Sequence, residues 1–231
     1  MGLSFTGRTI GDITVLKCHG QIVEGPDSAA LRQRVNEVLE HTPAIVLDLG
    51  GVNLIDSGGL GMLVRILARA GRDNLKLCGL TSRISETLKI TRLAAVFDCY
   101  QSEAEAIAGF YRIPTGSNLP SPFAAPNVLC VGKSAELLTY IQEVLRQAGL
   151  SVKTIDNLPD AVTLLKATTP RVVLVDHELR SAGTTGMVDM FNRLVEPLAV
   201  VELPSDFARR DPIETGPALV ERVRVLIGGV A

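Results

Sequence analysis

Residues 44–63 read AIVLDLGGVNLIDSGGLGML, and this stretch decides the fold of the first half of the chain. Ala44–Leu49 is a short, continuous apolar run, which is typical of a strand buried on both faces of a sheet. From Gly58 to Ala70 the apolar residues instead keep helical spacing, at Leu60, Leu63, Leu67 and Ala70. A strand followed at once by a helix predicts an α/β fold, in which helices cover a sheet.

The same alternation extends through the rest of the first half, where local propensity, turn residues and capping residues mark the boundaries. The expected elements are strands Ile13–Cys18 and Gln21–Val23 paired around a turn at His19-Gly20, a helix capped by Asp27 or Ser28 and running to about Glu40, strand Leu75–Leu80, a helix from about Ser82 to Thr91, strand Val96–Cys99 and a helix from near Ser102, where Glu105 can complete a capping box.

The second half repeats strand and helix in strict alternation, which predicts a doubly wound parallel sheet. The expected elements are a strand in NVLCVGKS (127–134), helix Ala135–Ala148, strand Ser151–Ile155, helix Pro159–Ala167, strand Val172–Asp176, a helix near Met187–Leu194, strand Ala199–Leu203 and helix Pro217–Ile227.

A proline-rich segment separates the two halves. Residues 111–126 contain four prolines, Pro114, Pro120, Pro122 and Pro126. Proline fixes its own φ and biases the preceding residue towards extended conformations, so this segment is expected to be a semi-extended linker. The predicted organisation is therefore a domain at 1–110, a linker at 111–126 and a second domain at 127–231.

Composition excludes several classes of function. The 231 residues carry a net charge of −2, and only 4% are aromatic, so neither a basic field nor a stacking platform for nucleic acid is present. No apolar run approaches the length of a membrane span, and no secretory leader is recognised at the N-terminus. Three of the four scattered cysteines, Cys18, Cys78 and Cys130, lie in apolar runs and fit buried thiols in a reducing compartment. A cytoplasmic protein with no nucleic-acid or membrane contact is expected.

The segment Asp56-Ser57-Gly58-Gly59-Leu60-Gly61 joins a strand to a helix. Ser57 suits the N-cap position, and glycines with free N–H groups favour an anion such as a phosphate or the carboxylate of a partner. Asp56 would repel a free phosphate unless it pairs with a donor. Tight packing of a strand-to-helix turn explains the glycines equally well. A nucleophile elbow is excluded because Ile55 stands at its first glycine, and the glycine spacing does not fit a dinucleotide fingerprint.

Over its whole length, the first half resembles a STAS domain, the family of bacterial anti-sigma factor antagonists. The resemblance rests on KCHGQIVEGPDSAAL (17–31), AIVLDLGGVNLIDS (44–57), GGLGML (58–63), LKLCGL (75–80) and ISETLKITRL (84–93). It implies a protein partner, either a serine-kinase-like anti-sigma factor or another STAS protein, with a homodimer as a further option. The residues implied to bind that partner are Asp56, Ser57, Gly58, Gly59, Leu60, Gly61, His19 and Gln21, on a surface centred on the 56–61 helix start and the adjoining turn His19–Gly25.

In that family the second hydroxyl residue at the helix start accepts phosphate from the anti-sigma kinase, and the modification blocks binding. Gly58 stands at this position and has no oxygen to accept phosphate. The resemblance therefore implies a binding surface without the usual charge switch, although Ser57 next to it is a phosphorylation candidate.

The second half resembles the receiver domain of response regulators, a flavodoxin-like fold. Asp176 matches the phospho-accepting aspartate, but Gly132 and Lys133 stand where the family holds Mg²⁺ with acidic residues. Lys133 is expected to form an ion pair with Asp176 instead. Gly132-Lys133-Ser134 lacks the rest of a P-loop, and His177-Glu178 lacks the second histidine of a zinc motif. A degenerate receiver that binds partners is expected.

These observations favour a non-enzymatic signalling protein that acts by binding an anti-sigma factor and so regulates transcription. No nucleophile–base pair, metal cluster or cofactor motif is recognised, so no catalytic residue, metal or cofactor is expected. Two alternatives stay open. One is a phosphorylation-switched protein with Ser57 or Asp176 as acceptor, and the other is a STAS module that binds an apolar ligand.

Overall fold

The strands of the computed structural model form two separate sheets, one in each of two units, Met1–Phe123 and Ala124–Ala231. The structure describes residues 2–111, 125–181, 191, 198–207 and 212–228. The expected linker, residues 111–126, lies almost wholly outside these ranges, and Tyr111 is the last residue of a helix. Among the described residues, no helix is both long enough and apolar enough to cross a membrane.

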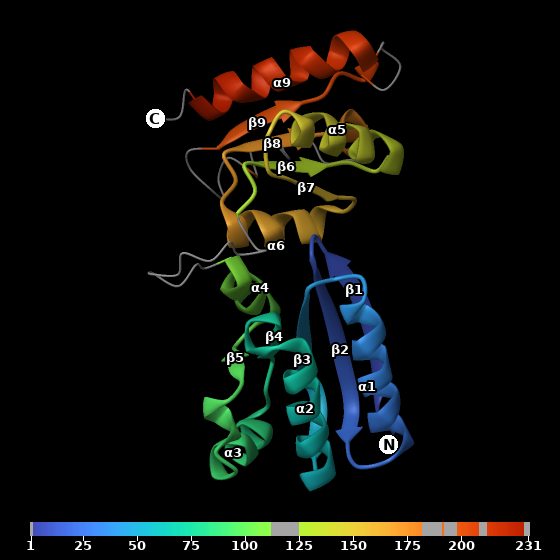
Figure 1. Cartoon of the computed structure of the whole chain (residues 1–231), viewed down its shortest axis with the longest axis vertical. Helices are drawn as coiled ribbons and strands as arrows, with labels where there is room; N and C mark the ends of the chain where they lie inside the picture. The colour runs from blue at the N-terminus through green and yellow to red at the C-terminus, as the bar shows by residue number, and fades with distance from the viewer. Residues whose placement is uncertain (1, 112–124, 182–190, 192–197, 208–211, 229–231) are drawn as a thin grey trace. The chain divides into compact units, whose positions relative to one another are not determined.

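The sheet of the N-terminal unit has five strands in the order β1-β2-β3-β4-β5 (Figure 1). Strand β1 pairs antiparallel with β2, and every other pairing in this sheet is parallel. The bounds are β1 (Ser4–Ile10), β2 (Ile13–Ile22), β3 (Ala44–Ile55), β4 (Leu75–Cys78) and β5 (Asp98–Tyr100). The strand-and-helix pattern predicted for residues 44–70 is confirmed, although β3 runs six residues beyond Leu49.

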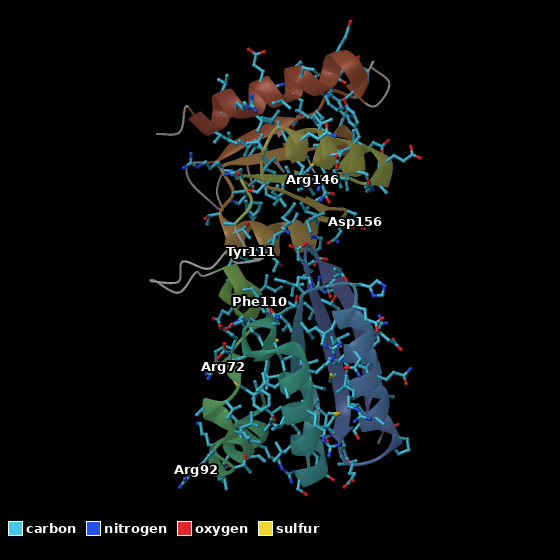
Figure 2. The ribbon with its side chains drawn as sticks, viewed as in Figure 1. Arg72, Arg92, Phe110, Tyr111, Arg146 and Asp156 are labelled. Carbon is cyan, nitrogen blue, oxygen red and sulfur yellow. The ribbon has the colours of Figure 1, made fainter. Side chains whose placement is uncertain are left out.

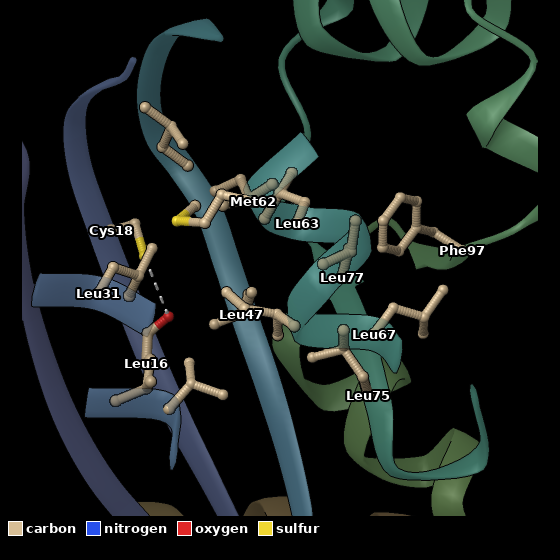
Figure 3. Close-up of a cluster of buried hydrophobic side chains, with 14 of the residues drawn as sticks. Leu16, Cys18, Leu31, Leu47, Met62, Leu63, Leu67, Leu75, Leu77 and Phe97 are labelled. Atoms are coloured by element: carbon tan, nitrogen blue, oxygen red, sulfur yellow. Dashed lines mark hydrogen bonds between the residues drawn. The ribbon is translucent and has the colours of Figure 1, made fainter. Parts of the chain in front are cut away.

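Helices α1 (Pro26–Leu39), α2 (Ser57–Ala70) and α3 (Ser82–Ile90) cover one face of this sheet. Their apolar stripes pack on alternate residues of the strands, and the core is fully buried at residues such as Leu47 and Leu63 (Figure 3). The intervening strand residues point to the opposite face, where α4 (Glu103–Tyr111) packs on β3, β4 and β5. Two 3₁₀ turns, η1 (Arg72–Asn74) and η2 (Leu93–Ala95), complete the unit.

The hairpin expected around His19-Gly20 is wrong. Strand β2 runs through both residues, with register shifts against β3 on either side of them, and Gly20 has a φ of +103°. The chain reverses instead at Gly11-Asp12, which connects β2 to β1, a strand that the sequence analysis did not identify. A glycine beside a polar residue marks a β-bulge as readily as a turn, and that ambiguity explains the error.

Helix α1 begins before the expected caps. Its N-cap is Gly25 and Pro26 follows it, a position that suits the fixed φ of proline, so neither Asp27 nor Ser28 is the cap. The Ser28 hydroxyl reaches back to accept a hydrogen bond from the Gly25 N–H at 3.2 Å. The loop between β2 and α1 is therefore only three residues long.

The C-terminal unit has four parallel strands in the order β7-β6-β8-β9. Its elements are β6 (Val128–Val131), α5 (Ala135–Gln147), β7 (Val152–Ile155), α6 (Leu158–Thr168), β8 (Val172–Val175), α7 (His177–Ser181), β9 (Ala199–Glu202) and α9 (Pro212–Gly228). In order of sequence this is 2-1-3-4, the first four positions of the flavodoxin-like sheet. Helix α9 begins five residues before the predicted Pro217, and the helix expected near 187–194 lies outside the described residues except for Phe191.

Helices cover both faces of this second sheet. Residues of α5 and α9 share one buried cluster with β6, β8 and β9. Helix α6 also contacts β6 and β7, and its buried residues Ala161, Leu164 and Leu165 are not part of that cluster. The predicted doubly wound α/β architecture is therefore confirmed.

One buried charge lies between β4 and α4 of the first unit. Lys76 is 5% exposed, and its Nζ lies 3.4 Å from Asp98 Oδ2 and 3.3 Å from the Tyr100 hydroxyl. The same ammonium lies 4.7 Å from the ring centroid of Phe110, which Figure 2 labels on α4. A buried ammonium needs such partners because burial strips it of water.

We expect Asp98→Ala to lower the free energy of unfolding by about 1–3 kcal/mol, because it leaves the Lys76 ammonium buried without its counter-ion. Lys76→Met removes the charge but keeps most of the side-chain volume, so its effect should stay within about 1 kcal/mol. Urea unfolding of both variants, followed by circular dichroism, gives the two values. A larger loss for Lys76→Met than for Asp98→Ala would contradict this account of the pair.

Candidate partner-binding site

Asp56 is the N-cap of α2. Its Oδ1 accepts a hydrogen bond from the Gly59 N–H at 2.6 Å, and its Oδ2 accepts one from the Glu24 N–H at 3.2 Å. The expectation that Ser57 caps this helix is wrong: Ser57 is the first helical residue, and it is exposed. The carboxylate of Asp56 has two oxygens and so ties the start of α2 to the loop before α1, which a single hydroxyl oxygen cannot do.

The hydrogen bonds to Asp56 also set its charge. The Gly59 N–H, and after it the Glu24 N–H, hold the pKa of the Asp56 carboxyl below its usual value of 3.8. A carboxylate that accepts backbone N–H groups is stabilised in its ionised form, and at a helix N-terminus it also faces the positive end of the helix dipole. Asp56 is thus paired with donors of its own chain.

Asp56 is expected to contribute to the free energy of unfolding only at pH values at which its carboxyl group is ionised. Because its pKa in the folded state is depressed, this contribution is present above its usual pKa and is lost as the pH falls through the folded-state value. The free energy of unfolding of Asp56→Asn should therefore fall less steeply below about pH 4 than that of the unmodified chain. Urea unfolding at a series of pH values measures both slopes.

Asp73→Asn is the matched control for this prediction, since Asp73 is an exposed carboxylate outside the α2 start. The free energy of unfolding of Asp73→Asn should depend on pH as that of the unmodified chain does. If Asp56→Asn also showed the pH dependence of the unmodified chain, the explanation that Asp56 caps α2 as a carboxylate would be incorrect.

Two glycines allow the start of α2 to lie directly against β2 and the β2–α1 loop. A Cβ at Gly59 would overlap the carbonyl oxygen of Ile22, and the Asp56 N–H donates a hydrogen bond to the same oxygen at 3.3 Å. A Cβ at Gly58 would lie 2.5 Å from the Cβ of Glu24. Gly58 and Glu24 are therefore complementary in shape: the side chain of Glu24 fills the space that a side chain at residue 58 would need.

Gly59→Ala should lower the free energy of unfolding by about 1–3 kcal/mol, since a rigid backbone carbonyl blocks the added methyl group. Gly61→Ala lies two residues further along the same helix, where a Cβ meets nothing within 4 Å, and should stabilise the chain by up to about 1 kcal/mol. Chemical denaturation of the two variants compares them directly. Equal effects at the two positions would contradict the close packing inferred for Gly59.

A hollow of about 430 Å³ lies between the starts of α1 and α2. Its lining residues come from the β2–α1 loop and from the facing sides of both helices: Glu24, Gly25, Ser28, Ala29, Arg32, Ser57, Gly58, Gly61, Met62 and Arg65. Of the residues predicted to bind a partner, Ser57, Gly58 and Gly61 lie here. Gly59 and Leu60 are buried and hold the helix against the sheet.

The other two predicted residues, His19 and Gln21, lie within β2, before the loop that lines the hollow. His19 is exposed, pairs with Gly51 of β3, and its ring covers the space where Gly51 has no side chain. Gln21 is half-buried opposite Leu54. Neither residue lines the hollow, whereas Glu24 and Gly25, at the end of the predicted turn His19–Gly25, do.

Arg32 and Arg65 line the hollow but were not predicted from the sequence. Helical spacing places Arg65 seven residues after Gly58, on the same side of α2, so this residue was open to identification from the sequence. The position of Arg32 opposite Arg65 depends on how the two helices pack, so it could not be identified from the sequence.

Asp176, the second phosphorylation candidate, follows β8 and is 6% exposed. Its Oδ1 accepts a hydrogen bond from the Glu178 N–H at 3.3 Å, and its Oδ2 is buried with no hydrogen-bond partner among the described residues. Lys133 is exposed and forms no ion pair with Asp176 in the described part of the chain, so that expectation is wrong. Within the described residues, no three His, Cys, Asp or Glu side chains gather in a way that could hold a metal ion.

Among solved structures, the chain is similar to an anti-sigma factor antagonist from Mycobacterium paratuberculosis, with 21% identity over 48% of this chain and 96% of that one and a TM-score of 0.43. A putative anti-sigma factor antagonist from Thermotoga maritima is similar at 21% identity over 47% and 95%, with a TM-score of 0.44. A putative two-component response regulator/GGDEF domain protein aligns at 15% identity over 90% of this chain and 99% of that one, with a TM-score of 0.28.

A comparison with protein families gives the identification. The STAS domain family matches residues 5–106, from the second residue of β1 into α4. The match takes in the whole of the five-stranded sheet except the first residue of β1, together with the α2 start and its hollow. The N-terminal unit of this chain is therefore a STAS domain.

Proposed function

We propose that this chain is a non-enzymatic signalling protein that binds a protein partner through its STAS domain, as an anti-sigma factor antagonist does. The partner is a kinase-like anti-sigma factor or another STAS protein, and any effect on transcription passes through that partner. The family match supports a binding role, and the net charge of −2 argues against direct contact with nucleic acid.

The observation that carries the proposal is the double hydrogen bond of Asp56. It joins the start of α2 to the β2–α1 loop, so that Glu24, Ser57, Gly58 and Gly61 form one surface, which we call the α2-start surface. Because backbone hydrogen bonds and glycine packing hold it in place, little conformational entropy is lost when a partner binds. Gly61, with open space around it, lets a partner approach the helix backbone closely.

Residue 58 of this surface cannot carry a phosphate charge. Gly58 has no oxygen to accept phosphate, and the Glu24 carboxylate lies beside it. Phosphorylation elsewhere in this family adds about −1.5 to −2 charges at a docking surface, and at residue 58 no such change can occur. We therefore propose binding that does not depend on phosphorylation of this position.

Gly61→Glu tests the proposal. The new side chain enters open space, so folding should be unaffected, but it places bulk and a negative charge on the α2-start surface. We expect affinity for the partner to fall by about tenfold or more. Biolayer interferometry against each kinase-like anti-sigma factor and each STAS protein of the native host measures this loss.

Ala68→Glu provides the matched control, because it adds the same side chain at an exposed position two turns further along α2. It should leave the affinity unchanged within about twofold. The proposal fails if none of these proteins binds the unmodified chain, or if both variants bind as the unmodified chain does.

The phosphorylation-switched alternative centres on Ser57, which is exposed on the same surface. Intact-mass measurement after incubation with the kinase-like partner distinguishes a phosphorylation switch at Ser57 from binding that does not depend on phosphorylation. A chain that gains no phosphate but still binds supports the fixed surface, whereas one that gains phosphate at Ser57 and then releases the partner supports the switch.

A further inference from the structure

A second hollow, of about 520 Å³, continues the α2-start surface along the groove between α1 and α2. The two helices pack side by side (Figure 1), and both hollows share Ala29, Arg32 and Arg65. The remaining residues that line the second hollow are Gln33, Asn36, Ile66 and Arg69. From Gly58 to Arg69 the combined groove follows α2 for about 16 Å, at 1.5 Å per residue.

Three arginines of this groove have no counter-ion among the residues that the structure describes. Arg32, Arg65 and Arg69 are exposed, and none forms an ion pair within the described ranges. Four other arginines of the chain form ion pairs: Arg8 with Glu103, Arg34 with Glu37, Arg72 with Asp98 and Arg146 with Glu143.

The sequence of α2 reinforces this local charge. Helix α2 contains no acidic residue over its whole length, and the one acidic residue that lines either hollow is Glu24 at the far end. The groove is therefore basic along the helices and acidic only at its mouth, in a chain whose net charge is −2.

The spacing of these residues suits carboxylates. Arg65 and Arg69 are four residues apart, so they are neighbours on one face of the helix, and Arg32 lies across the groove from them. A guanidinium is a planar donor that binds carboxylates through two parallel hydrogen bonds. The amides of Gln33 and Asn36 add further donors beside them.

We propose that this groove binds an acidic segment of a partner protein, through its Asp or Glu side chains. The length of the groove favours a polypeptide, since a single small anion would contact only one end of it. The lining contains no aromatic side chain on which a base could stack, which disfavours nucleic acid. This inference rests on the proposed function: it names the chemistry that the partner presents next to the α2-start surface.

A fluorescein-labelled oligoglutamate peptide is the probe, and its binding to the full chain is followed by fluorescence polarisation at low and at physiological salt. We expect binding that weakens as salt is raised. The double variant Arg65→Glu/Arg69→Glu should lower the affinity by about tenfold or more, because it replaces two attractive contacts with repulsive ones.

Arg83→Glu/Arg92→Glu is the matched control, since both arginines are exposed, lie outside the groove and form no ion pair in the described chain. It should change the affinity by no more than about twofold. Equal losses in both double variants would show a response to net charge alone and would overturn the inference. Displacement of the peptide by millimolar inorganic phosphate would also overturn it, in favour of a small-anion site.

The test of the acidic-segment proposal and the test of the proposed function can fail independently of each other. Loss of partner binding in Gly61→Glu with full binding in Arg65→Glu/Arg69→Glu keeps the proposed function and rejects the acidic segment. Binding of the peptide, lost only in the groove variant, supports the acidic segment even where no host protein binds the α2-start surface.

Discussion

The arrangement of the STAS domain site depends on one carboxylate. Asp56 ends the connection from β3 and begins α2, and its two oxygens accept hydrogen bonds from backbone groups of two different segments, Gly59 in the first turn of α2 and Glu24 in the β2–α1 loop. A helix leaves its first N–H groups without partners inside the helix, and an N-cap side chain satisfies one of them. Here the same group also fixes the β2–α1 loop, so helix capping and formation of the surface are a single interaction.

Close approach of the backbones makes this interaction possible. Gly59 lies against the Ile22 carbonyl and Gly58 against the side chain of Glu24, and neither position leaves room for a Cβ. The glycines of the DSGGLG segment therefore have different roles: Gly58 and Gly59 permit packing, whereas Gly61 lies open to solvent. The sequence left packing and partner binding as competing explanations for the segment. Packing explains Gly58 and Gly59, and Gly61 is the open position used by the proposed partner binding.

Periodicity predicted most of the fold, and the errors arose where two local patterns fit the same residues. The helical stripe of Leu60, Leu63 and Leu67 was unambiguous, and so was the apolar strand before it. His19-Gly20 fits a turn or a bulge, and only its pairing with β1 and β3 decides between them. Asp56 and Ser57 are both good N-caps, and the nearby Glu24 N–H, from a loop 32 residues earlier, favours the carboxylate.

The same reasoning explains why the basic groove was not identified from the sequence. The positions of Arg65 and Arg69 on one side of α2 follow from their spacing, but a charged helix face is usually solvated or paired. Near-neutral composition averages over the chain and conceals local segregation of charge. Arg34 is paired within its own helix, whereas Arg32, two residues before it, points to the other side of α1 and towards α2. A two-residue step along a helix rotates the side chain by about 200°, so it separates an arginine that is paired within its own helix from one that lines the groove.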